Sequence, residues 1–225
     1  MLLLITPQNK RHYKEILKDM FFARYRVFKQ KLGWNIPCEG FLEKDQFDHD
    51  HAYYLVYLGY KGEVVGGMRM MSTAVPHMTR DVFRDAVDDP MLLPSSPCVF
   101  ECSRFFVDTE AYQDYASLKE RLYLQSPTDV QKVVSELLVS LMEFGLGMNL
   151  SSIITVSEIR MERILRRSGW SLNRLGQPKN MGDSLAVVGT LEVSEVIYSH
   201  LCEKAGIHYP VLWAPLYHKK NSVSS

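Results

Sequence analysis

The sequence predicts an α/β fold, with a single mixed sheet at the centre and helices flanking it. Two strand-like runs separated by a short turn, residues 52–59 and 63–72, predict an antiparallel hairpin. After residue 99, strands alternate with amphipathic helices, which is typical of strand–helix–strand crossovers. A sheet with both kinds of connection is mixed. The 225 residues suit one large domain, which we assign to residues 1–218, with residues 219–225 as a polar, flexible tail.

The elements of the first half follow from hydropathy. The apolar run Leu2–Ile5 predicts a first strand. Apolar residues then recur at three- and four-residue steps over residues 9–32, which predicts a helix that ends at Gly33. The hairpin comes next, with residues 60–62 as its turn, and the run Val99–Val107 predicts a further strand.

The second half begins with the strongest helical pattern of the chain. Its apolar positions, on or near one helix face, are Val133, Leu137, Leu138, Leu141, Met142 and Phe144. The expected order is a helix over 129–148, a strand over 151–157, a helix over 158–168, a strand over 185–193 and a helix over 194–205. This order favours an acetyltransferase (GNAT)-like sandwich.

Composition narrows the function classes. Lys plus Arg and Asp plus Glu both number 26, so no net field favours nucleic acid or an anionic membrane, and neither is expected as a partner. No apolar run is long enough to span a bilayer, and the apolar N-terminus is too short for a secretory signal, so we expect a cytoplasmic protein. The four cysteines lack metal-ligand spacing; we expect no metal and four reduced, buried thiols.

Charged residues interrupt apolar segments at Arg24, Arg69, Glu101 and Arg104. Isolated ions are costly to bury, so these residues need partners, and Asp45 and Asp48 lie in a nearby loop. We expect the acids and bases to meet in one cleft. A structural salt-bridge network, or charges on an exposed sheet face, is the alternative.

The spacing of Glu101 and Arg104 limits this idea. They are three residues apart, so a regular strand points them to opposite faces. Both reach one ligand directly only if the strand bulges or ends there. Otherwise one of them lies on the opposite face of the sheet and supports the cleft without contacting the ligand.

Read in order, these segments resemble the LuxI-type autoinducer synthases, which make acyl-homoserine lactones. The resemblance is carried by residues 24–28 (RYRVF), 32–34 (LGW), 43–48 (EKDQFD), 54–56 (YLV), 64–70 (VVGGMRM) and 100–105 (FECSRF). The second half matches more loosely, at residues 153–156 (IITV) and 166–170 (RRSGW).

The resemblance implies an acyltransferase that joins an acyl group to S-adenosylmethionine and closes a lactone. S-adenosylmethionine is then a substrate, no further cofactor is expected, and the acyl donor is acyl carrier protein or coenzyme A. The positions that match the family's invariant set are Arg24, Phe28, Trp34, Asp45, Asp48, Arg69, Glu101 and Arg104. Phe83 falls where the family often has an aromatic residue that contacts the nucleotide.

These positions suggest roles in two groups. The expected catalytic residues are Glu101, as the base for the amine, with Ser103, Arg104 and Asp45. S-adenosylmethionine would be bound by guanidinium groups on its carboxylate, by acids on its ammonium or ribose, and by rings on its adenine or sulfonium. The residues expected to do so are Arg24, Phe28, Trp34, Asp45, Asp48, Arg69, Phe83 and Arg104. Packing in the core is an equal alternative for Phe28.

The acyl chain and its donor need surfaces of their own. For the acyl pocket we expect Phe105, Leu141, Thr155 and Val156. Thr155 matches a family position that suggests contact with a 3-oxo group, although a simple strand residue is the favoured alternative. For docking of a carrier protein we expect the basic helix residues Arg160, Arg163, Arg166 and Arg167, whose alternative is a solvated helix face.

Two rival functions fit the same fold. An acetyl-coenzyme A-dependent N-acetyltransferase usually carries a glycine-rich pyrophosphate loop after the central strand, but Asp108-Thr109-Glu110 follows here. A non-catalytic ligand sensor would be expected to have lost Glu101, Arg104 or Asp45, and all three are present.

Overall fold

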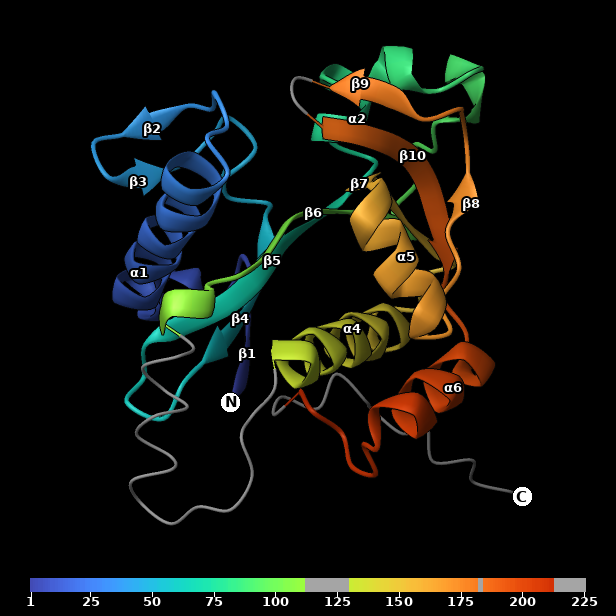
Figure 1. Cartoon of the computed structure of the whole chain (residues 1–225). Helices are drawn as coiled ribbons and strands as arrows, with labels where there is room; N and C mark the ends of the chain where they lie inside the picture. The colour runs from blue at the N-terminus through green and yellow to red at the C-terminus, as the bar shows by residue number, and fades with distance from the viewer. Residues whose placement is uncertain (112–129, 182–183, 213–225) are drawn as a thin grey trace.

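The computed structural model describes residues 1–111, 130–181 and 184–212. Their largest feature is an eight-stranded sheet in the order β1-β4-β5-β6-β7-β10-β8, with β9 paired to β10 (Figure 1). The strands are β1 (Leu2–Ile5), β4 (Tyr53–Leu58), β5 (Val64–Ser72), β6 (Val99–Val107), β7 (Ser152–Glu158), β8 (Asn173–Arg174), β9 (Lys179–Met181) and β10 (Ser184–Glu192).

Helices cover both faces of this sheet. One face carries α1 (Lys14–Arg24), which continues as the π-helix η2 (Tyr25–Lys31), and the small hairpin of β2 (Cys38–Glu39) and β3 (Leu42–Glu43) (Figure 1). The opposite face carries α4 (Val130–Gly147), α5 (Ile159–Arg167) and α6 (Glu195–Ala205). The short elements are η1 (Lys10–His12), α2 (Met78–Asp81), η3 (Arg84–Ala86) and η4 (Pro90–Leu92).

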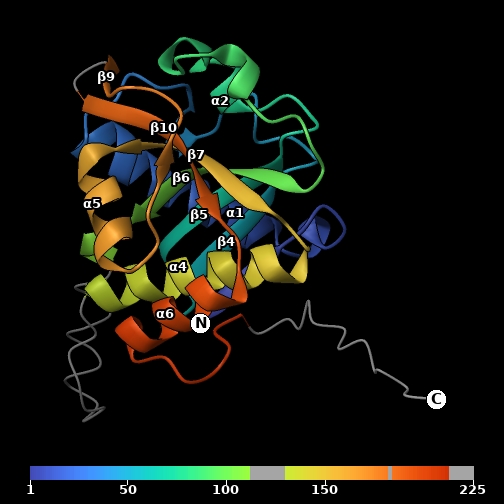
Figure 2. The ribbon, with the colours of Figure 1, turned by 90° about the vertical axis from the view of Figure 1, so that its right-hand side faces the viewer.

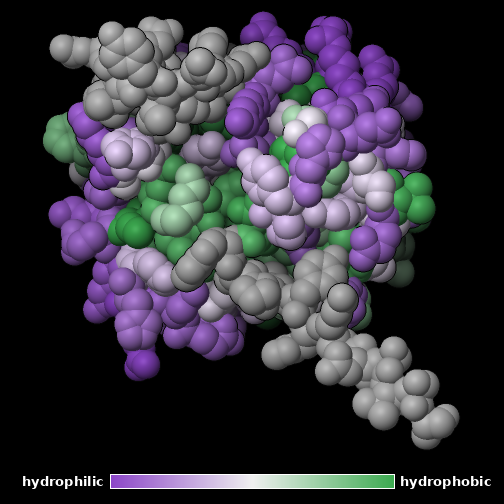
Figure 3. Space-filling model, turned by 90° about the horizontal axis from the view of Figure 1, so that it is seen from below, coloured by the Kyte–Doolittle hydropathy of each residue, from purple (hydrophilic) through white to green (hydrophobic). Residues whose placement is uncertain are grey.

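Strand alternation sends side chains into two cores. Along β5, Met68 and Met70 join the core under α4, whereas Met71 joins the core under α1. Figure 2 shows α4 and α6 together below the sheet, with α2 and β9 at the opposite end. Seen from below, a hydrophobic area lies left of the centre of the surface and is surrounded by polar side chains (Figure 3).

The centre of the sheet holds its one parallel strand pair, β6 with β7, among the described strands. The helix α4 lies between them in sequence, as is usual for the connection of two parallel strands. Their register runs from Val99 opposite Ser152 to Cys102 opposite Thr155. Beyond this point β6 pairs only with β5, and β7 pairs only with β10, so the two strands diverge.

A bulge interrupts β6 just after the divergence. Ser103 faces Arg69 and Phe106 faces Gly67, so two residues of β6 lie opposite one of β5. Arg104 takes φ +56°, which is uncommon for a residue with a side chain. A bulge was the condition for Glu101 and Arg104 to reach one ligand directly, and it is present.

Most predicted elements are confirmed to within one or two residues. The predicted helix over residues 9–32 is divided into a 3₁₀ turn, α1 and a π-helix. The short elements β2, β3, β8 and β9 were not predicted. The prediction of four buried thiols was wrong, because Cys98 is exposed and Cys38 and Cys202 are half-buried.

The predicted tail at residues 219–225 lies outside the described residues. Among the helices that the structure describes, none combines the length and the apolar character that crossing a bilayer requires.

Candidate functional site

Six charged side chains meet on the α1 face of the sheet. We call them the arginine–carboxylate cluster; its members are Arg24, Glu43, Asp45, Asp48, Arg69 and Arg104. Arg24 is the last residue of α1, Arg69 lies on β5, and Arg104 is the bulge residue of β6. The acids come from β3 and the loop that follows it.

The inner part of the cluster is held by bidentate contacts. Arg24 donates through Nη1 and Nη2 to the two oxygens of Asp48, at 2.8 and 2.9 Å, and through Nε to Glu43. Arg69 Nη1 lies 3.1 Å from Asp48 Oδ1. Paired, hydrogen-bonded ions of this kind are the form in which a protein tolerates buried charge.

The outer part joins two strands to the loop. Arg69 Nη1 donates to Asp45 Oδ1 at 2.5 Å, and Arg104 Nη2 donates to Asp45 Oδ2 at 2.8 Å. Arg104 Nε also donates to Glu43 Oε1 at 3.1 Å, so Glu43 bridges Arg104 and Arg24. Three guanidinium groups thus face three carboxylates.

Electrostatics favour the charged forms of Asp48, Arg24 and Arg69. Burial by itself raises the pKa of Asp48, but the charges of Arg24 and Arg69 and the hydrogen bonds to the carboxylate outweigh burial and hold that pKa well below its usual range. The pKa values of Arg24 and Arg69 are raised, because the neighbouring carboxylates outweigh the lowering by burial. Tyr54 donates its hydroxyl to Asp48 at 3.1 Å, and burial followed by the Asp48 charge raises its pKa.

The cluster has a sealed side and an open side. The side chains of Arg24, Glu43, Asp48 and Arg69 are at most 1% exposed, whereas those of Arg104 and Asp45 are 10% and 7% exposed. Arg69 Nη2 has no hydrogen-bond partner among the described residues, and Arg104 Nη1 meets only the sulfur of Met78, at 3.5 Å. One spare donor, Arg69 Nη2, is therefore buried inside the cluster, and the other, Arg104 Nη1, belongs to the more exposed side.

Glu101 lies beside the cluster but is not one of its ion pairs. It shares the α1 face with Ser103 and Arg69, because Glu101 opposes Met71 and Ser103 opposes Arg69 in the ladder. Its carboxylate is buried and accepts from the backbone N–H of Met78, at 3.3 Å, and of Thr79. Ser103 Oγ accepts from Arg69 Nε at 3.2 Å, which attaches Ser103 to the cluster.

Two aromatic rings adjoin the open side. Phe28 and Trp34 stack with centroids 5.0 Å apart and planes 13° apart, and the Arg104 guanidinium lies 5.8 Å from the Phe28 centroid. Phe28 is only 3% exposed and packs in the core, whereas Trp34 is half-buried. Trp34 is therefore the ring with free surface for a ligand.

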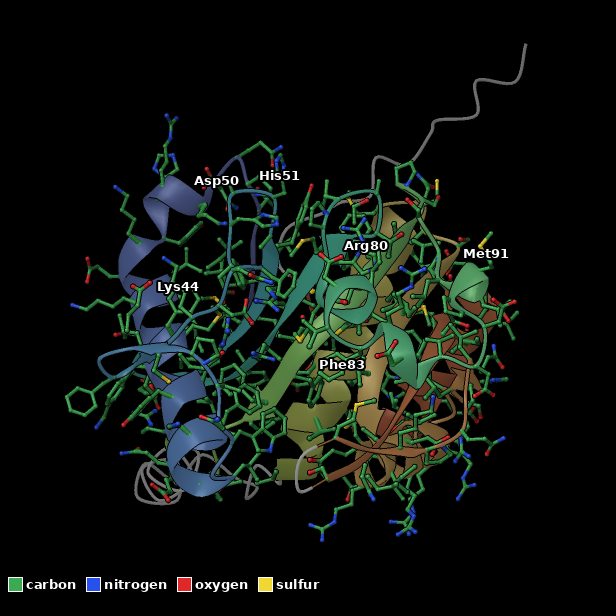
Figure 4. All side chains as sticks on the ribbon, turned by 90° about the horizontal axis from the view of Figure 1, so that it is seen from above. Lys44, Asp50, His51, Arg80, Phe83 and Met91 are labelled. Atoms are coloured by element: carbon green, nitrogen blue, oxygen red, sulfur yellow. The ribbon has the colours of Figure 1, made fainter. Side chains whose placement is uncertain are left out.

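Phe83 lies further along the same side. It follows α2, is half-buried and packs against both neighbouring apolar clusters. Figure 4 places it near the middle of the view, between the α1 side, where Lys44 is labelled, and η4, where Met91 points outward.

The residues expected in the acyl pocket are divided between two faces. Phe105, Leu141 and Thr155 lie on the α4 side, next to the divergence of β6 and β7. Val156 points to the opposite face, where it packs with Ile154 and Val188. The structure thus brings together three of the four.

The expected docking residues are exposed on α5, away from the cluster. The salt bridge of Arg174 with Glu162, at 2.7 Å, engages a different residue of the same helix. A hollow of about 150 Å³ lies at the end of β6, and its lining includes Arg26, Lys31 and Asp108 but none of the predicted site residues.

Glu43 is the one member of the cluster that was not predicted from the sequence as a site residue. Its signal was present, since it begins the segment EKDQFD and alternates with Asp45. Its burial, at 0% exposure, and its two arginine partners became visible only when α1 and β6 were placed around it. Among the described residues, no group of three or more His, Cys, Asp or Glu side chains is arranged to hold a metal ion.

A mixed sheet with helices on both faces, whose parallel central strands diverge, is typical of an acyltransferase-type fold. The sequence model of the autoinducer synthase family matches residues 8–201, and the chain belongs to this family.

Relatives agree with this assignment. The chain is 29% identical over 201 residues to an acyl-homoserine-lactone synthase of Agrobacterium fabrum, covering 89% of this chain and 90% of that protein. It is similar to the solved structure of MesI, a CoA-dependent acyl-homoserine lactone synthase, with a TM-score of 0.77, 25% identity and coverage of 95% and 99%. The fold also matches BjaI, solved with SAM and isopentyl-CoA, with a TM-score of 0.79, 21% identity and coverage of 94% and 92%. The protein is an acyltransferase that makes an acyl-homoserine lactone signal.

Proposed function

We propose that the open side of the arginine–carboxylate cluster binds S-adenosylmethionine and that Glu101 prepares its amine to attack an acyl thioester. The observation that carries the proposal is the placement of a charge-balanced cluster and a separate buried carboxylate on one face of β6, at the divergence from β7. This arrangement supplies a polar site on one side of the strand and an apolar site on the other.

Recognition of S-adenosylmethionine follows from the unused donors. Its carboxylate fits Arg104 Nη1, which donates to the weak sulfur acceptor of Met78, and Arg69 Nη2, which is buried and has no partner among the described residues. Asp45, the less buried acid, fits the ammonium or ribose. Trp34 offers a ring face for adenine or the sulfonium. Phe83 lies on the same side of the molecule and suits the nucleotide.

In the first step the amine becomes a nucleophile. An α-amine has an unperturbed pKa of about 8 and arrives largely protonated at neutral pH. Glu101 takes this proton, directly or through a water molecule, and the amine forms an amide as the thiol of the acyl donor leaves. The oxyanion of the tetrahedral intermediate is stabilised by backbone N–H groups near the bulge, where β6 has no partner strand on the β7 side.

In the second step the carboxylate of the acylated donor attacks the carbon next to the sulfonium. The carbon–sulfur bond breaks, its electron pair stays on sulfur, and 5′-methylthioadenosine leaves. The protein mainly holds the chain in the conformation that closes the ring. The guanidinium groups of Arg69 and Arg104 orient the carboxylate for this attack.

The acyl group fits the α4 side of the divergence, next to Phe105, Leu141 and Thr155. Its donor is an acyl thioester of carrier protein or of coenzyme A. The exposed arginines of α5 suit an acidic carrier protein. Residues 1–218 act as one domain in the cytoplasm without a further cofactor.

The test is to incubate the purified chain with S-adenosylmethionine and with acyl-coenzyme A or acylated carrier protein. We expect methylthioadenosine and lactone in equal amounts, and a loss of about 10²- to 10⁴-fold in turnover for Glu101→Gln. An N-acylated product without methylthioadenosine would instead indicate a simple N-acyltransferase. Wild-type turnover in Glu101→Gln would remove Glu101 from the mechanism.

A further inference from the structure

Three aromatic rings close a triangle on the α4 face of the sheet. The ring centroids of Tyr53 and Phe100 are 5.6 Å apart, those of Tyr53 and Phe144 are 5.6 Å apart, and those of Phe100 and Phe144 are 5.5 Å apart. Phe100 is 4% exposed and Phe144 is fully buried. Phe100 contacts Tyr53 and Phe144 edge to face, at interplanar angles of 66° and 64°, and the Tyr53 and Phe144 rings are tilted by 59°.

The strand register connects this triangle to the point where β6 and β7 diverge. Thr155 opposes Cys102, Cys102 opposes Met70, and Met70 opposes Tyr53, so one cross-strand row joins the divergence to the triangle. Phe100 precedes Cys102 by two residues and shares its face. Phe144 reaches the same spot from α4.

An acyl chain that enters at the divergence on this face therefore meets the row and then the rings. Cys102 adds no charge to this path, since burial raises the pKa of its thiol to about 12. Cys102, Met70, Phe100 and Phe144 are buried, Tyr53 is half-buried, and the hydroxyl groups of this set belong to Thr155 and Tyr53. Protein interiors are close-packed, so a longer chain must displace a ring or stay outside.

We propose that Tyr53, Phe100 and Phe144 form the floor of the acyl site and restrict this enzyme to short acyl chains. The inference rests on the proposed function, because it assumes that the acyl group lies next to Phe105 and Thr155. The substrate class is a short, unbranched or compactly branched acyl thioester. Phe100 and Phe144 are specificity-determining residues, and they take no part in the bond-making steps.

The experiment uses the purified full-length chain, S-adenosylmethionine and a series of straight-chain donors from butanoyl to dodecanoyl, as coenzyme A esters and on carrier protein. Methylthioadenosine release gives kcat/KM for each donor. The wild type is expected to favour the shortest donors. Phe144→Leu and Phe100→Leu each open the floor and are expected to raise the long-to-short ratio of kcat/KM by about 10- to 200-fold for each added methylene accommodated.

Leu201→Ala is the matched control. Leu201 is buried in the same apolar core but lies on α6, and the substitution makes space away from the row. Its profile along the donor series is expected to match the wild type. Thermal unfolding of each variant identifies any that fails to fold, and two separate floor variants keep the test valid if one does.

Three results would overturn the inference: a wild type that prefers the longest donors, a flat wild-type profile, or floor variants whose profile shifts no more than that of Leu201→Ala. In all three, methylthioadenosine release from short donors would leave the proposed function in place. Release from no donor at all would overturn the proposed function together with the inference.

Discussion

The two faces of the central sheet differ in what they bury. The α1 face holds the three arginines and three carboxylates of the cluster together with Glu101, whereas the α4 face is filled mainly by aliphatic and aromatic side chains. Apolar burial stabilises a fold, but a buried ionic group is often no more stabilising than apolar residues of the same volume. We therefore expect apolar burial on the α4 face to contribute most of the stability, and we propose that the charge on the α1 face serves a ligand.

Glu143 shows that a buried carboxylate is not in itself a functional sign. It lies on α4 and accepts from the backbone N–H groups of Val211 and Leu212 and from the hydroxyl of Tyr198. These partners fix the segment after α6 to the helix. Glu143 therefore serves structure, because its contacts hold residues 211 and 212 against α4.

The largest loss of stability on the α1 face is expected for Arg24→Met. It leaves Glu43 and Asp48 buried without their shared guanidinium group, although a hydrophobic side chain of similar length fills the space. We expect the free energy of unfolding to fall by about 3–5 kcal/mol, measured by urea denaturation. A change below about 1 kcal/mol would show that water or other groups compensate the two carboxylates.

On the other face, Leu138→Ala is the counterpart. Leu138 is 1% exposed in the core under α4, and its truncation is expected to cost about 2–5 kcal/mol. The apparent affinity for S-adenosylmethionine should stay as in the wild type, because the cluster lies across the sheet. A large loss of affinity in this variant, with the protein folded, would show that the two faces are not independent.

A smaller effect is expected in the pH dependence of the free energy of unfolding, to which Asp48 on the α1 face contributes. The pKa of Asp48 is held low in the folded chain, while that of an unfolded Asp is about 3.9. The folded state then binds fewer protons, so the stability from Asp48 is fully present above about pH 4 and is lost as the pH falls towards the folded pKa. Unfolding free energies measured from neutral pH downwards should fall less steeply in Asp48→Asn than in Leu138→Ala, and equal slopes would contradict this.

The sequence was most informative where local pattern decides structure. The bounds of β6 and the helix α4 follow from alternation and helical period, and Arg24, Asp45, Asp48, Arg69 and Arg104 stood out as charges in or near apolar segments. Glu43 did not, because its burial depends on α1 and β6, which are far from it in sequence. The π-helix and the bulge at Arg104 are set by tertiary packing, which periodicity does not capture. The strand period showed only that Glu101 and Arg104 need a bulge or a strand end to reach one ligand.

The smallest stability effect is expected at the exposed arginines of α5. Replacing Arg163, Arg166 and Arg167 together by Ala should change the free energy of unfolding by less than about 0.5 kcal/mol per site, because their side chains are solvated. If α5 docks a carrier protein, KM for the acylated carrier protein rises and becomes less sensitive to salt, while KM for acyl-coenzyme A stays constant. An unchanged KM for both donors would remove α5 from the docking surface.

Calorimetric titration of S-adenosylmethionine into the wild type and into Arg104→Gln tests directly whether the arginine–carboxylate cluster binds this substrate. Arg104 is the least buried arginine of the cluster, and Glu43 and Asp45 keep Arg24 and Arg69 as partners when it is replaced. We expect the variant to fold. Its affinity for S-adenosylmethionine should be weaker by about ten-fold or more, because a hydrogen bond to a charged group is lost. Equal affinity in the two proteins would place the substrate elsewhere and contradict the account.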